Sequence, residues 1–166
     1  NGIADEGEQT TTTGAGGVYK FNRFCNASTV LTGGTNVVSD TVSYTFTGLL
    51  KAPKGSTVIT PITTLIAEIA GENASIAEIK AAQKVVATLL DLPENTDLTH
   101  IDPIAKAEEG DESLLKTTLA VQQLVSEIAK LFTTSTPDAD LNQLVISKLV
   151  ETIQSSSTPL IDADGE

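Results

Sequence analysis

The sequence has few of the residues used for catalysis, cross-linking or base stacking. It contains one cysteine, one histidine, no tryptophan and no methionine in 166 residues, and only 4% of them are aromatic. So few aromatic rings argue against surfaces that stack on nucleic-acid bases or sugars. The lone Cys25 cannot form a disulfide within the chain, which leaves a buried thiol or a bond between chains. Because no methionine precedes Asn1, we interpret the chain as a piece of a longer protein.

Basic residues are also scarce. Ten Lys and Arg face 22 Asp and Glu, which gives a formal net charge of -12. A field of this sign repels nucleic acid and anionic membrane surfaces and attracts cations. No run approaches the roughly 20 apolar residues that a membrane-spanning helix needs. We therefore expect no nucleic-acid partner and no membrane span.

Common catalytic motifs are missing as well. The sequence has no G-x-S-x-G, H-E-x-x-H, phosphate-binding P-loop or G-x-G-x-x-G pattern. His100 lies close to Asp102 in T-H-I-D-P, which is one candidate acid–base pair. Asp102 followed by Pro103 is also typical of the start of a turn or helix. We predict that the protein is not an enzyme.

Residues 1–60 have the composition of short β-strands. Three runs are rich in β-branched and aromatic residues: GGVYKFNRF at 16–24, STVLT at 28–32 and DTVSYTFTGLL at 40–50. Glycine and proline clusters at 33–34 and 52–55 separate them. This pattern predicts about four or five antiparallel strands.

Beyond residue 60 the apolar period becomes helical. Thr60 is a candidate N-cap, with Pro61 in the first turn and Gly71 as the stop. Ser75 and Glu78 have the spacing of a capping box at the start of a second helix. Two later helices are predicted by apolar residues at near-helical spacing: Leu114, Leu115, Leu119, Leu124, Ile128 and Leu131, then Leu141, Leu144, Val145, Leu149 and Ile153.

These patterns predict an α+β fold with three regions. A small N-terminal antiparallel β part over 1–60 packs on a bundle of about four helices over 61–156. Residues 157–166 form an extended acidic tail. Within it Pro159, Leu160 and Ile161 are either a strand donated to an open sheet edge of a neighbouring subunit or part of a frayed terminus.

The N-terminal octapeptide NGIADEGE matches the second half of an EF-hand-type calcium loop. Asn1 takes the third ligand position and the next residue is the glycine of the sharp turn. Ile3 then offers its backbone carbonyl, Asp5 is the next ligand, and Glu8 falls at the acidic closing position.

The C-terminal run DADG supplies the missing first half. Asp162 and Asp164 read as the opening ligands of the same loop. We therefore predict one calcium ion held by both ends of the chain. The halves could meet within one subunit, between two subunits, or only in a longer parent protein. Solvated acidic termini are the simpler alternative.

Residues 1–21, NGIADEGEQTTTTGAGGVYKF, resemble the calcium-loop opening of carboxypeptidase-regulatory-like and B-type repeats in bacterial surface proteins. Gly17, Tyr19 and Phe21 match the G-x-Y-x-F part of that opening, and Thr and Gly replace the aspartate usually found before it. The segments at 50–69 and 89–107 are similar to a helical module that follows such openings in large secreted bacterial proteins and adhesins. The sequence begins in mid-loop, so we expect the β part to lack a preceding strand.

The resemblance implies an extracellular architectural role. We expect either a filament subunit that associates head to tail with itself through calcium-stabilised junctions, or an adhesin module that contacts other cell-surface components. The alternative is a peptide- or glycan-binding module of a secreted multidomain protein. In each case the expected location is secreted or at the cell surface.

Overall fold

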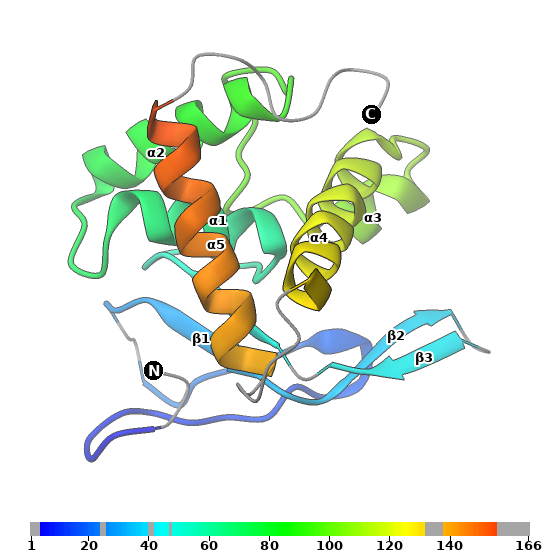
Figure 1. The fold of residues 1–166 in the computed structure, drawn as a ribbon. Helices are drawn as coiled ribbons and strands as arrows, with labels where there is room; N and C mark the ends of the chain where they lie inside the picture. Colours follow the sequence, from blue (N-terminus) through cyan, green and yellow to red (C-terminus); the bar gives the residue numbers. More distant parts are fainter. Residues whose placement is uncertain (1–3, 24–25, 40–41, 47, 132–137, 156–166) are drawn as a thin grey trace.

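The structure is a computed structural model that describes residues 4–23, 26–39, 42–46, 48–131 and 138–155. Figure 1 shows two layers, with the strands and the N-terminal segment beneath a group of helices. The helices carry most of the apolar core. The strand layer is therefore the thinner and more exposed part of the molecule.

The described strands form two antiparallel pairs. β1 (Thr29–Thr32) pairs with β4 (Leu49–Ala52), with Val30 opposite Lys51. β2 (Thr35–Ser39) pairs with β3 (Val42–Thr45). The β2–β3 hairpin is thus inserted between the two strands of the outer pair.

The two pairs follow one another along a single two-stranded ribbon. β1 continues into β2 through Gly33 and Gly34, whose φ angles are 63° and 109°. The backbone N–H of Phe46 donates to the carbonyl of Gly34 at 2.9 Å, between the two pairs. Positive φ at two successive residues favours glycine and interrupts the regular ladder. One bent hairpin is the result.

This hairpin corrects the predicted architecture. The chain is α+β, but the small sheet of four or five strands is wrong, because at no point in the described residues do more than two strands lie side by side. The segment 16–24 was expected to be a strand. Its described part instead contains a short 3₁₀ helix, η1 (Ala15–Gly17), and no strand. The Tyr19 and Phe21 rings contact edge to face at 5.9 Å.

The helical prediction needs a smaller correction. Five α-helices are described rather than about four, because a short helix follows Pro103. Their bounds are α1 Pro61–Ala70, α2 Ile76–Leu89, α3 Pro103–Glu108, α4 Ser113–Leu131 and α5 Asp138–Ser155.

Local sequence accounts for the helix starts. Thr60 accepts a hydrogen bond from the backbone of Thr63 and caps α1, which Gly71 ends. Ser75 and Glu78 form the predicted capping box of α2. Each cap satisfies backbone N–H groups that have no partner inside the helix.

α2 ends at Leu89. The helix stops before Pro93, at a turn in which Asp91 has φ of 51°. Asp91 N–H donates to Thr88 and Leu92 N–H donates to the carbonyl of Ala87. This is the hydrogen-bond pattern of a Schellman motif, whose left-handed position is usually glycine.

α1 is the centre of the helical layer. It contacts α2, α4, α5 and β4. All six residues from 62 to 67 are buried, and Ile62, Leu65 and Ile66 are at most 2% exposed. Burial of each such side chain contributes about 1.5 to 3 kcal/mol relative to exposure. The contact with β4 is what fastens the strand layer to this core.

Candidate calcium-binding turn and strand edges

The acidic N-terminal residues form a tight turn. Gly7 has φ of 95°, and the backbone N–H of Glu8 donates to the carbonyl of Asp5 at 3.1 Å. In return, the backbone N–H of Asp5 donates to Oε2 of Glu8 at 3.0 Å. Positive φ at the third turn residue favours glycine, so Gly7 makes this geometry possible. The turn holds Glu8 beside the backbone of Asp5, on an exposed surface.

This turn contains two of the six predicted calcium ligands. Asn1, Ile3, Asp162 and Asp164 lie outside the described residues. In the described part of the chain, no three His, Cys, Asp or Glu residues gather as a metal site would require. Calcium takes six to eight oxygen ligands. Carboxylate oxygens at residues 5 and 8 fit such a donor set, which needs further ligands from elsewhere.

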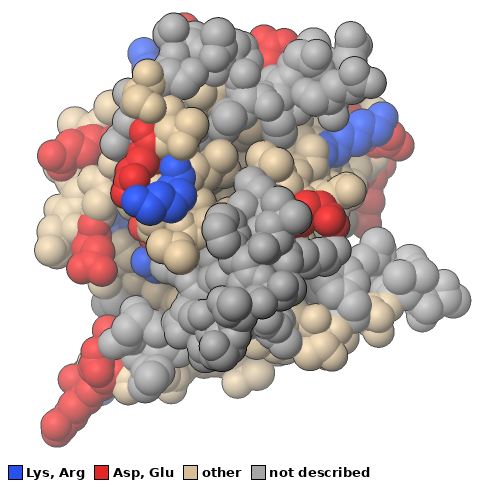
Figure 2. Space-filling model, in the orientation of Figure 1, with Lys and Arg blue, Asp and Glu red and all other residues tan. Residues whose placement is uncertain are grey.

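The acidic turn projects from the strand side of the molecule. Figure 2 shows acidic side chains protruding at the lower left, where Figure 1 places the N-terminal segment. Neighbouring carboxylates repel one another unless a cation or solvent screens them. The turn is therefore accessible both to a cation and to a second molecule.

α5 carries the chain away from this turn. In Figure 1 it starts at the level of the strands and ends at the level of α2. Its 18 residues span about 27 Å at 1.5 Å per residue. Ser155, the last described residue, is thus at the far side of the helical layer from the acidic turn. Pro159, Leu160 and Ile161, the predicted donor strand, lie outside the described residues.

The outer edge of β4 is closed by α1. The backbone N–H of Lys51 donates to Oγ1 of Thr64 at 3.0 Å. The carbonyl of Lys51 accepts from Oγ1 of Thr63 at 2.9 Å and lies 3.2 Å from that of Thr64. Both threonines are fully buried. Side-chain hydroxyls therefore occupy the hydrogen-bonding positions that a further strand would need at Lys51.

An ion pair provides a further contact between β4 and α1. Nζ of Lys51 lies 2.7 Å from Oε1 of Glu68, one turn further along α1, and both side chains are about four-fifths buried. Sequence analysis identified Thr60 as a cap but missed that Thr63 and Thr64 serve β4. The T-P-x-T-T motif gave no local signal of this contact, because it begins eight residues after β4 ends.

The outer edge of β1 is not closed in this way. In an antiparallel pair, the backbone N–H and C=O groups of two opposite residues either bond to each other or both point away from the partner strand. Because the backbone groups of Lys51 point to α1, those of its partner Val30 point away from β4. The backbone groups of Thr32, two residues further along β1, also point away from β4. None of the hydrogen bonds found among the described residues uses these outward groups, and Val30 is 42% exposed.

His100 does not pair with Asp102. Asp102 caps α3 and accepts from the backbone of Ile104 at 2.8 Å. Nδ1 of His100 lies instead 2.9 Å from Oδ1 of Asp97, to which Thr99 also donates. Burial pushes the pKa of Asp97 upward, but the hydrogen bonds from His100 and Thr99 outweigh it and hold the pKa below the ordinary value of 3.8. These contacts stabilise a turn.

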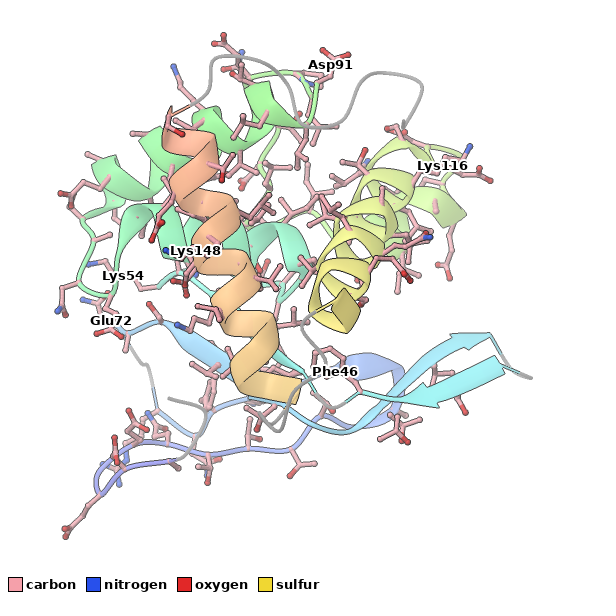
Figure 3. The ribbon with its side chains drawn as sticks, in the orientation of Figure 1. Phe46, Lys54, Glu72, Asp91, Lys116 and Lys148 are labelled. Carbon is pink, nitrogen blue, oxygen red and sulfur yellow. The ribbon has the colours of Figure 1, made fainter. Side chains whose placement is uncertain are left out.

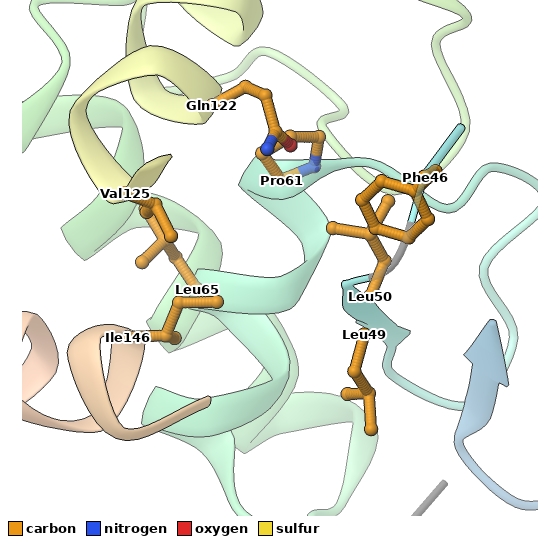
Figure 4. A pocket seen from close by; sticks show the side chains of 8 residues that line it. All are labelled: Phe46, Leu49, Leu50, Pro61, Leu65, Gln122, Val125 and Ile146. Carbon is orange, nitrogen blue, oxygen red and sulfur yellow. The ribbon is translucent and has the colours of Figure 1, made fainter. Parts of the chain in front are cut away.

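A small apolar pocket lies between β4, α1, α4 and α5 (Figure 4). Its volume is about 10 Å³. Its lining residues are Phe46, Leu49, Leu50, Pro61, Leu65, Gln122, Val125 and Ile146. Ligand pockets usually enclose about 300 to 1,000 Å³, so this one has room for no more than a water molecule. It offers no site for a glycan or cofactor.

No helix in the described part of the chain is both long and apolar enough to cross a membrane. Comparisons with protein-family models, with curated proteins and with solved structures found no match to this chain.

Proposed function

We propose that the protein is an extracellular structural module that associates with copies of itself, with calcium at the junctions. Its location would be secreted or at the cell surface, as in the bacterial surface proteins whose calcium-loop openings it resembles. In a filament the contact would be head to tail, and other cell-surface components are the alternative partners.

The supporting observation is the exposure of the described N-terminal region. Between residues 4 and 46, none of the residues whose exposure is described is buried. A two-stranded hairpin is at best marginally stable in water and needs a further surface to pack against. Among the described strands, β4 is the one that packs closely against α1. The rest of the ribbon and the N-terminal segment remain available to a partner.

Calcium would permit this association electrostatically. Each copy carries a formal net charge of -12, so copies repel one another. A divalent cation shared by the turn at Asp5 and Glu8 and by carboxylates of a neighbour removes that repulsion where the molecules touch. Association of this kind should be reversed by a chelator.

Light scattering and electron microscopy during a calcium titration test the proposal. Calcium should produce filaments that a chelator dissolves. The variant Asp5→Asn with Glu8→Gln should lose this response, because it removes two charges while a glutamine oxygen can still accept from Asp5 N–H. The matched control is Glu6→Gln with Glu72→Gln, which removes the same charge from exposed sites; Glu72 lies in the α1–α2 loop (Figure 3). A chain that stays monomeric at every calcium concentration overturns the proposal.

A further inference from the structure

We infer that the outer edge of β1 receives a strand from the tail of a second copy, centred on Leu160 and Ile161. This inference rests on the proposed self-association and names the two surfaces that meet. It concerns backbone hydrogen bonding at one strand edge and is separate from the calcium ligands.

β1 presents the geometry that an added strand requires. The N–H and C=O groups of Val30 and Thr32 point outward at a spacing of two residues, which is the repeat of a strand ladder. The side chain of Val30 is 42% exposed, so an apolar residue already stands at this edge. An incoming strand would satisfy backbone groups and cover apolar surface at the same time.

The opposite edge of the same pair is already occupied at Lys51. At Lys51 the hydroxyl groups of Thr63 and Thr64 occupy the outward backbone positions. The β1–β4 pair therefore offers one acceptor edge in each copy. One acceptor and one donor per copy make a heterologous contact, which propagates as a filament if it does not close into a ring.

The tail has the chemistry of a donor strand. Leu160 and Ile161 are adjacent apolar residues in an otherwise polar segment, STPLIDADGE. Pro159 lacks a backbone N–H and is tolerated only at the first residue of a strand or at an edge. It therefore limits the donated strand to a short segment that begins at the apolar pair.

Chain length makes the donor a second molecule. Leu160 lies five residues after Ser155, and five extended residues reach about 17 Å. α5 rises from the level of the strands over about 27 Å before it reaches Ser155 (Figure 1). The tail thus falls short of the β1 edge of its own chain, whereas the tail of a neighbour has no such limit.

Proline substitution at the edge tests the inference on the full chain. Val30→Pro removes an outward N–H that the β1–β4 ladder does not use, so the fold should be retained. Val30→Ala removes the side chain but keeps the N–H. We expect the alanine variant to assemble with calcium and the proline variant to remain monomeric, with equal far-UV circular dichroism and urea midpoints. Assembly of both variants overturns the inference and leaves self-association standing.

A disulfide cross-linking experiment shows whether the strand bound at the outer edge of β1 comes from the same chain or from a second copy. Val30→Cys and Ile161→Cys are combined in a Cys25→Ser chain, oxidised, and run on a non-reducing gel. A ladder of covalent oligomers that grows with protein concentration supports exchange between copies. A fast-migrating monomer shows that the edge holds its own tail and overturns the inference. Absence of any cross-link in material that still assembles overturns it as well, and failure of the parent chain to assemble overturns the proposed function with it.

Discussion

The two halves of the molecule are stabilised by different means. From residue 48 onward, buried apolar side chains of four helices gather in one core centred on α1, and Leu49 and Ala52 of β4 are buried as well. Between residues 4 and 46, none of the side chains whose exposure is described is buried, and backbone hydrogen bonds and turns maintain the shape. Hydrophobic burial supplies most of the free energy of folding, so the two regions should respond very differently to mutation.

The largest difference is expected from truncation of a core side chain. Leu65→Ala should lower the free energy of unfolding by about 2 to 5 kcal/mol, because it removes buried methyl groups and leaves a cavity. Val37→Ala, at a side chain 63% exposed on the ribbon, should change it by no more than about 0.5 kcal/mol. Urea denaturation measures both. Equal losses would show that the ribbon has a core of its own.

The junction between the regions should be the next most sensitive point. Thr64→Val keeps the shape of the side chain but leaves the N–H of Lys51 without its partner. A buried unsatisfied donor costs about 1 to 3 kcal/mol. The control is Thr88→Val, whose hydroxyl donates to a helix carbonyl on the exposed side of α2. If both variants have the same urea midpoint, the threonine contact does not join β4 to the helices.

Within the helical half, a substitution at the end of α2 should increase the stability of the protein. Asp91 adopts φ of 51° in a position where glycine has no steric cost. Asp91→Gly should therefore stabilise the protein by about 1 kcal/mol. Asp91→Ala retains the Cβ atom and should bring no such gain. Equal melting temperatures of the two variants would show that the backbone at Asp91 is not strained.

The smallest expected effect is a pH dependence at the turn near α3. Contacts with His100 and Thr99 lower the pKa of Asp97 in the folded protein. A carboxyl whose folded pKa is depressed stabilises the fold above its unfolded pKa and loses that contribution as pH falls through the folded value. Because the side chain is 54% exposed, solvent screening limits the effect to about 0.5 kcal/mol. The stability difference between the parent chain and Asp97→Asn should be present at pH 6 and be lost as the pH falls through the folded pKa of Asp97.

Sequence reasoning succeeded where the interactions are local. The caps at Thr60 and Ser75 bond to residues three positions away, so their spacing alone predicts them.

The errors arose where a distant partner decides the structure. Residues 16–23 alternate as a strand does, yet no strand pairs with them in the described part of the chain. The run 40–50 contains two strand segments because Gly34 lies opposite Phe46 and the ladder is interrupted there. Nothing near Lys51 in the sequence indicates that its backbone bonds to α1. The calcium ligands and the tail remain predictions.

The threonines of α1 have one more consequence, for solubility. An exposed strand edge is a template on which identical molecules can stack without limit. With Lys51 bound to Thr63 and Thr64, two copies cannot join through this position of β4. Loss of these hydroxyls should therefore promote disordered aggregation as well as lower stability. The same two side chains that attach the ribbon to the core would also protect the protein from precipitation.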